Sequence, residues 1–171
     1  MANRGKLSNL TAGEVEAIIL NSYDDIYKYC YWKIKDCAEA EDLTQETFLR
    51  FVQALSDYKE QGKPKALLYT IARNLCLNWY KQRKPLALSE APDIVPTEAD
   101  TEHLENQIVL EQCIQLLPPD QQEILLLRYG QELQVNEIAE VMGMSRFAVM
   151  YRIRNALDAL NKELRKGGVF I

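Results

Sequence analysis

The chain has 171 residues, of which 47% are hydrophobic and 26% are charged, and its formal net charge is −5. This composition suits one or two small domains and argues against a membrane protein, because no run of about 18 apolar residues occurs. The N-terminal sequence lacks the apolar core of a signal peptide, so we expect a cytoplasmic protein without membrane insertion.

The cysteines and the histidine give no support for a metal site. The four cysteines contain no CxxC pair, and the only histidine is His103. We therefore expect no metal and no cofactor, and thiols that are reduced and mostly buried. The cysteines are Cys30, Cys37, Cys76 and Cys113.

The negative charge is concentrated in the middle of the chain. Residues 1–86 have a net charge of +2, residues 87–117 contain no Lys or Arg and have a net charge of −7, and residues 118–171 are neutral. The overall acidity therefore does not exclude nucleic-acid binding by the flanking segments, although neither has the strong positive excess of a typical DNA-binding domain.

The first block, residues 1–84, is predicted to be all helix. The TAGE motif that begins at Thr11 has the spacing of a capping box, and apolar residues then recur every three or four positions up to Ile34. Two further periodic segments follow, separated by Gly62 and Pro64. The predicted apolar positions are Leu43, Thr47, Phe51 and Leu55 in the first of these segments and Leu68, Ile71, Ala72, Leu75 and Trp79 in the second.

Residues 85–103 are predicted to be an acidic, flexible linker. Three prolines and scattered acidic residues occur there without any helical period. The acidic composition is compatible with two roles, a plain solvated tether or a segment that mimics nucleic acid inside a positively charged channel.

The second block, residues 104–171, is predicted to contain four helices, and the last two form a helix-turn-helix. Ser145 is placed to cap the final helix. Periodicity puts Arg146, Phe147, Met150, Tyr151 and Arg154 mostly outward. It puts Val149, Ile153, Ala156, Leu157, Leu160 and Leu164 on the buried face. The expected fold is thus all-α, with two small helical domains on a tether.

Several segments together resemble the extracytoplasmic-function sigma factors of the bacterial sigma-70 family. AEAEDLTQETFLRFVQAL and LYTIARNLCLNWYKQRK are similar to region 2, and LPPDQQEILLLRYGQELQVNEIAEVMGMS is similar to region 4. The resemblance implies a subunit that binds core RNA polymerase, recognises the −10 and −35 promoter elements and helps to open the duplex. It implies no enzymatic activity, and the sequence offers no phosphate loop and no nucleophile paired with a base.

The resemblance assigns three groups of site residues. In region 2, a helix face would bind the clamp helices of the largest polymerase subunit. The segment after it would bind the −10 element, because melted bases need aromatic groups and phosphates need cations. Region 4 would bind the −35 element and contact the flap of the second largest subunit. The polymerase-binding residues are Asp42, Gln45, Glu46, Phe48, Leu49, Arg50 and Gln53. The −10 residues are Tyr58, Lys63, Lys65, Tyr69, Arg73, Asn74, Asn78, Lys81, Arg83 and Lys84. The −35 residues are Ser145, Arg146, Phe147, Met150, Tyr151, Arg152 and Arg154.

The recognition helix departs from the family pattern. Phe147, Met150 and Tyr151 stand where Gly, Lys and Ser are frequent, so an outward cation is lost and bulky apolar groups are gained. These groups are suited to thymine methyls, or to a protein such as an anti-sigma factor. In region 2, Leu67 stands where Trp is common and Asn78 where Asp is common.

Two other functions compete with promoter specificity. One is a helix-turn-helix regulator that binds duplex DNA without melting it, for which the first block would be unnecessary. The other is a sigma-like protein that binds polymerase but reads the −35 element weakly. Trp79 is likewise open to two roles, since it falls on the apolar stripe and could also stack on a base.

Overall fold

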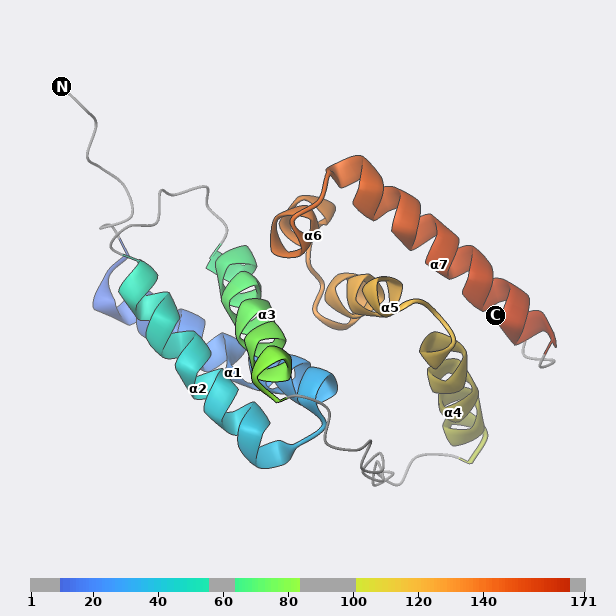
Figure 1. Ribbon diagram of the computed structural model, residues 1–171, viewed down its shortest axis with the longest axis horizontal. Helices are drawn as coiled ribbons and strands as arrows, with labels where there is room; N and C mark the ends of the chain where they lie inside the picture. The colour runs from blue at the N-terminus through green and yellow to red at the C-terminus, as the bar shows by residue number, and fades with distance from the viewer. Residues whose placement is uncertain (1–9, 56–63, 84–100, 167–171) are drawn as a thin grey trace. The chain divides into compact units, whose positions relative to one another are not determined.

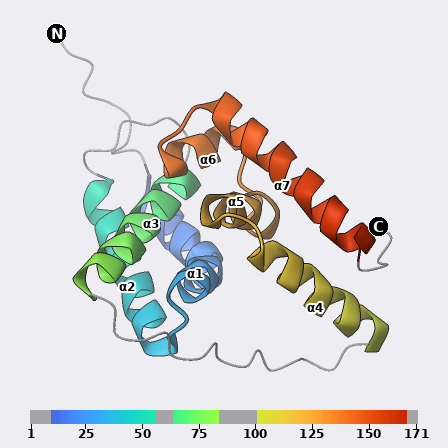
Figure 2. The same cartoon turned by 45° about the vertical axis from the view of Figure 1, so that its right-hand side comes forward.

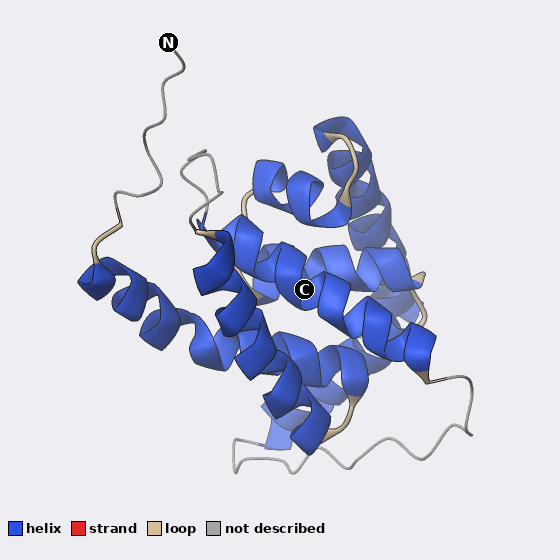
Figure 3. Cartoon of the chain, turned by 60° about the vertical axis from the view of Figure 1, so that its left-hand side comes forward, coloured by secondary structure: helices blue, strands red, loops and turns tan. Residues whose placement is uncertain are grey.

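The structure is a computed structural model that describes residues 10–55, 64–83 and 101–166, without the side chains of residues 101–106. The chain divides into two compact units, residues 1–92 and 93–171. All regular elements of the described residues are helical (Figure 3), which confirms the all-α prediction. The helices are α1 (Ala12–Ile34), α2 (Cys37–Ala54), α3 (Pro64–Gln82), α4 (Thr101–Gln115), α5 (Pro119–Leu125), η1 (Leu126–Gly130, a π-helix), α6 (Val135–Met142) and α7 (Arg146–Lys166).

The first unit is a bundle of α1, α2 and α3, which all contact one another (Figure 1). The predicted capping box starts α1: the Glu14 amide donates to Thr11 Oγ1 at 3.3 Å, and the Thr11 amide donates to Glu14 Oε2 at 2.7 Å. Lys35 ends α1 in the left-handed conformation, with φ of 59°. Asp36 then caps α2, because its Oδ1 accepts from the Glu39 amide at 3.0 Å. Helix α2 therefore begins directly after the end of α1, with no long connection between them.

The core stripe of α2 differs from the predicted one. Thr47 and Phe51 are fully buried as predicted, but Leu43 and Leu55 are only half-buried. The buried stripe contains Ala40, Thr44, Thr47, Phe48 and Phe51. The two threonines fit the core because their hydroxyls donate to the carbonyls of Ala40 and Leu43, at 2.6 and 2.7 Å, so no polar group is left unpaired.

In the second unit, α7 packs against α4, α5 and α6 (Figure 2). The sequence predicted one helix up to Gly130, but its last turn widens into η1, where the Gln131 amide donates to Leu126 O at 2.9 Å. The core contains Cys113, Leu117, Leu125, Ala156, Leu160 and Leu164. Leu157 was wrongly assigned to the buried face. Its exposure is 37%, because the stripe follows Val149, Ala156 and Leu160 and leaves Leu157 at its edge.

Part of the predicted linker is helical, and most of the cysteines are buried. Helix α4 begins at Thr101, so the last residues of the predicted linker 85–103 are helical. The remainder of that linker lies outside the described residues. Cys30, Cys76 and Cys113 are buried free thiols, whereas Cys37 is exposed, in line with mostly buried cysteines.

Candidate functional site

The outer face of α2 is a mixed polar and apolar surface. Asp42, Gln45, Leu49, Arg50 and Gln53 are exposed, and Glu46 is intermediate. The Leu49 side chain is 60% exposed, and Val52, which was not among the predicted site residues, adds a second apolar group that is 48% exposed. Arg50 Nε donates to Glu46 Oε1 at 2.6 Å. An exposed pair of this kind contributes little to stability, so both charges remain available to a partner. We call Asp42, Gln45, Glu46, Leu49, Arg50, Val52 and Gln53 the outer face of α2.

Phe48 does not belong to this face, which corrects its assignment as a polymerase contact. It is 6% exposed and its ring stacks on Tyr23, with ring centroids 5.7 Å apart. The reason is geometric: position 48 lies between Thr44 and Phe51 on the side of α2 that faces α1 and α3. Phe48 therefore occupies its position in the motif because it packs inside the bundle of α1, α2 and α3.

The residues predicted to bind the −10 element fall into several environments. Tyr58, Lys63 and Lys84 lie outside the described residues. On α3, Asn74, Asn78 and Lys81 are exposed, while Lys65 and Arg73 are intermediate. The exposed members are three or four residues apart, so they lie on one side of the helix. This side is polar and carries the Lys81 charge.

Tyr69 is a core residue and not an accessible DNA contact, which is a second correction. It is 1% exposed, and its ring meets Tyr29 edge to face with centroids 5.4 Å apart. Burial raises the pKa of the Tyr69 hydroxyl far above its usual range, so the group stays neutral. The sequence pattern did not reveal this burial, because Tyr69 was predicted to bind DNA as an aromatic side chain near a melted strand.

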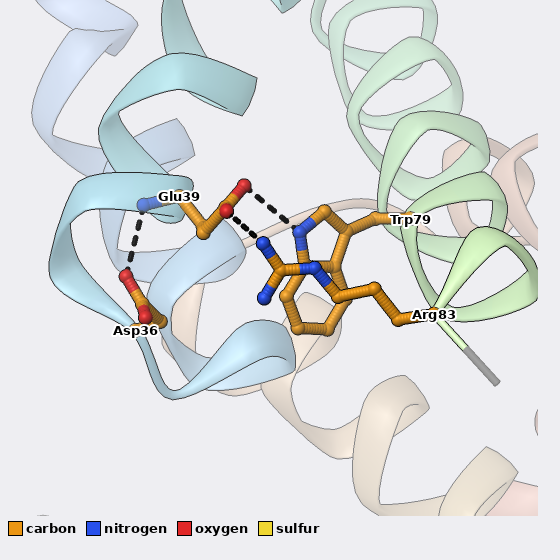
Figure 4. A network of polar contacts seen from close by, with 4 residues as sticks. All are labelled: Asp36, Glu39, Trp79 and Arg83. Atoms are coloured by element: carbon orange, nitrogen blue, oxygen red, sulfur yellow. Dashed lines mark hydrogen bonds and ion pairs between the residues drawn. The ribbon is translucent and has the colours of Figure 1, made fainter. Parts of the chain in front are cut away.

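Trp79 and Arg83 form a polar network with the start of α2 (Figure 4). The indole Nε1 of Trp79 donates to Glu39 Oε2 at 2.9 Å, and Arg83 Nη2 is hydrogen-bonded to Glu39 Oε1. The Arg83 guanidinium also lies over the Trp79 ring, 4.4 Å from its centroid. Trp79 therefore has a structural role, joining α3 to α2, and Arg83, predicted as a −10 contact, is already held by a carboxylate.

We expect Glu39→Ala to lower the free energy of unfolding of the first unit by about 1 kcal/mol, because a partly buried indole N–H loses its acceptor. Glu39→Gln should cost roughly half as much, since its amide oxygen still accepts from Trp79. Both tryptophans, Trp32 and Trp79, lie in this unit, so urea unfolding followed by tryptophan fluorescence reports on it.

The control for this prediction is Glu46→Ala, which breaks the exposed pair with Arg50. It should change stability by less than about 0.5 kcal/mol. Equal stability of the Glu39→Ala protein and the unmodified protein would show that the network does not support the bundle.

The recognition helix α7 begins as the sequence predicted. The Ala148 amide donates to Ser145 Oγ at 3.1 Å, so Ser145 caps the helix. Gly143 precedes it with φ of 64°, a left-handed conformation that favours glycine and turns the chain between α6 and α7. Arg146, Phe147, Met150, Tyr151 and Arg154 are all exposed. The predicted outward residues therefore do lie on the free side of the helix.

Arg152 is the exception among the residues predicted for the −35 element. Its Nε donates to Asp120 Oδ2 at 2.7 Å, and its side chain is only 35% exposed. This ion pair ties α7 to the first turn of α5. The sequence pattern could not reveal this role, because Asp120 is 32 residues away.

The described residues contain no group of His, Cys, Asp and Glu side chains that could hold a metal ion. Within the same residues, no helix is both long enough and apolar enough to cross a membrane. Three exposed helix faces form the candidate site: the outer face of α2, the polar side of α3 and the outward side of α7.

Comparison with known families gives two matches in chain order. Residues 18–85 match the profile of Sigma-70 region 2, and residues 107–160 match that of Sigma-70, region 4. The first profile covers all of α2 and α3 and most of α1. The second covers all of α5, η1 and α6 and most of α4 and α7.

Among curated proteins, the chain is 37% identical to the ECF RNA polymerase sigma factor BldN of Streptomyces coelicolor, over 81% of this chain and 56% of BldN. It thus spans little more than half the length of that relative. It is 29% identical to the ECF RNA polymerase sigma factor SigW of Bacillus subtilis, over 96% of this chain and 98% of SigW.

Two solved structures share the fold. The sigma factor RpoE from Bartonella quintana, solved with the anti-sigma factor NepR, aligns with a TM-score of 0.73 at 19% identity, over 90% of this chain and 98% of RpoE. CnrH, solved with the cytosolic domain of CnrY, aligns with a TM-score of 0.66 at 20% identity, over 94% of this chain and 92% of CnrH.

Proposed function

Because this chain belongs to the sigma-70 family, in its extracytoplasmic-function group, we propose that it is a promoter-specificity subunit of bacterial RNA polymerase. It binds the core enzyme and directs initiation at promoters whose −10 and −35 elements it recognises. Such a subunit selects promoters and leaves RNA synthesis to the polymerase, so the chain itself is not an enzyme. It acts in the cytoplasm, where promoter DNA is transcribed.

One observation carries this proposal: a single chain contains both units, each with an exposed helix face that its own fold does not require. The outer face of α2 has apolar Leu49 and Val52 among polar groups, a mixture that suits a separable protein interface. A regulator that only binds duplex DNA would need α6 and α7 but not this first unit.

For the −10 element, the proposal uses the polar side of α3 together with the segments that flank this helix. Asn74, Asn78 and Lys81 are exposed there. The predicted contacts Tyr58 and Lys63 precede α3 in the sequence and Lys84 follows it, and all three lie outside the described residues. Aromatic stacking and phosphate contacts from such a segment would hold a melted strand.

For the −35 element, α7 is the recognition helix of a helix-turn-helix. In this motif, the N-terminal residues of the second helix contact base edges in the major groove. Arg146 and Arg154 supply cations for phosphates or guanine edges. The polymerase is expected to strengthen binding, because residues 1–86 have a net charge of only +2 and residues 118–171 are neutral.

The proposed function also includes a place for the acidic segment inside the polymerase and an anti-sigma factor as inhibitory partner. Residues 87–100, which precede α4, have a net charge of −4 and no Lys or Arg, and this composition suits a channel built for polyanions. An anti-sigma factor is a reasonable partner, since RpoE was solved with NepR, which is such a factor. Its docking surface on this chain would overlap the faces that otherwise bind polymerase or DNA.

Run-off transcription tests the function directly. Core polymerase is mixed with the purified full chain and a library of genomic fragments, and the transcripts are sequenced from their 5′ ends. We expect discrete start sites that are absent with core polymerase alone and share two upstream elements. Unchanged transcripts on addition of the chain would contradict the proposed function.

A further inference from the structure

The first two turns of α7 carry an exposed apolar face, formed by Phe147, Met150 and Tyr151. Their side chains are 83%, 53% and 65% exposed. Spacings of three and four residues place them on one side of the helix, where they form a continuous surface. Three large apolar groups together on the surface mark a place where a partner binds.

The fold does not need this apolar face of α7. Val149, Ala156 and Leu160, on the other side of the helix, are buried and hold α7 against the second unit. Ser145 fixes the helix start through its bond to the Ala148 amide. The three exposed side chains can therefore be changed without removing a core contact or a cap, which makes them suitable for a test of recognition.

The surroundings of the apolar face favour duplex DNA as its occupant. Arg146 precedes the face and Arg154 follows it, both exposed, so cations frame the apolar groups along the helix. The same helix follows the left-handed turn at Gly143, in the position that enters the major groove in a helix-turn-helix. The phosphates that border this groove complement the two arginines.

The chemistry of the side chains selects the base. Neither Phe nor Met has a donor for the acceptors of guanine or adenine. Phe has no acceptor for the amino group of cytosine, and the thioether sulfur of Met is only a weak one. In the major groove, thymine alone presents a methyl group, which apolar side chains contact favourably. We infer that Phe147 and Met150 determine −35 specificity by contacting thymine methyl groups. This inference rests on the proposed function and adds the base that is recognised.

The test removes single methyl groups from the DNA. Promoters obtained by run-off transcription are synthesised with each −35 thymine, on either strand, replaced in turn by deoxyuridine, which lacks only the methyl. Initiation is measured with polymerase limiting. We expect at least one replacement to lower the initiation rate about fourfold. This factor corresponds to the free energy gained by burying one methylene-sized apolar group.

Variants assign the effect to the side chains. In the Phe147→Ser and Met150→Gln double variant, thymine and deoxyuridine should support equal initiation, because the methyl has lost its apolar contact. Leu116→Ala is the matched control. Leu116 is 72% exposed and lies outside α7, so its variant should keep the full sensitivity to deoxyuridine. Circular dichroism melting verifies that each variant is folded.

The possible results separate the inference from the function on which it rests. Absence of specific initiation contradicts the proposed function. Specific initiation that no deoxyuridine affects, or a −35 element built only of G·C pairs, overturns the thymine inference alone. Sensitivity to deoxyuridine that persists in the Phe147 and Met150 double variant also overturns the thymine inference. Loss of binding to a protein partner in that variant, without sensitivity to deoxyuridine, would assign the apolar face to protein recognition.

Discussion

Replacing Arg146 and Arg154 together with alanine is expected to lower initiation at −35-dependent promoters by about 100-fold. Each arginine is exposed, and no other described residue engages it, so both side chains are available to DNA. A contact to a guanine edge or phosphate contributes about 1–3 kcal/mol, and the loss of two such contacts gives this magnitude. The measurement is run-off transcription at limiting polymerase.

The control removes the same charge from the other end of the helix. Lys162→Ala with Arg165→Ala replaces two exposed cations of α7 that lie far from Ser145. It should change initiation by about threefold or less, the effect of a general loss of electrostatic attraction. Equal losses in both double variants would mean that α7 acts through net charge and not through its N-terminal half. Full activity of the Arg146 and Arg154 double variant would show that α7 does not recognise the −35 element through these arginines.

Leu49→Asp is expected to weaken binding to core polymerase by about 100-fold or more. Leu49 is 60% exposed at the centre of the outer face of α2, and truncating a hot-spot residue near the centre of an interface costs about 2 kcal/mol or more. The aspartate would in addition bury a charge against the partner. The dissociation constant is measured by titrating labelled full-length chain with core polymerase.

Leu20→Asp provides the matched control, since it introduces the same charge at an exposed leucine. Leu20 lies on α1 and is 72% exposed. This variant should bind polymerase with an affinity within about threefold of the unmodified chain, as expected for a surface position outside the interface. If Leu49→Asp binds as well as Leu20→Asp does, the outer face of α2 is not the polymerase-binding surface.

Much of the local structure followed from the sequence. The capping box at Thr11, the N-cap at Ser145 and the outward side of α7 were all predicted, and all are present. These features depend on residues within one or two turns of one another, so the period of apolar residues and the capping positions suffice to predict them. The π-helical turn at Leu126–Gly130 was not predicted, because its apolar pattern is also that of an ordinary helix.

For three predicted site residues, the sequence did not reveal the contacts they make within the fold, and the reason is the same for all three. Phe48 and Tyr69 were assigned to partner binding by motif and residue type, yet both pack inside the first unit. Arg152 was counted among the DNA contacts, yet it pairs with Asp120. In each case, the decisive neighbour belongs to another helix, and a periodic pattern along one helix carries no information about it.

By itself, the sequence determined that this protein is helical, that its two blocks carry sigma regions 2 and 4, and which side of α7 is free. Only the tertiary structure decided which of the candidate side chains are available to a partner. Trp79 and Arg83 meet Glu39 across 40 and 44 residues of chain, and Arg152 meets Asp120 across 32. The physical reason is that hydrogen bonds and burial depend on distance in space, whereas helical period and capping depend on distance along the chain.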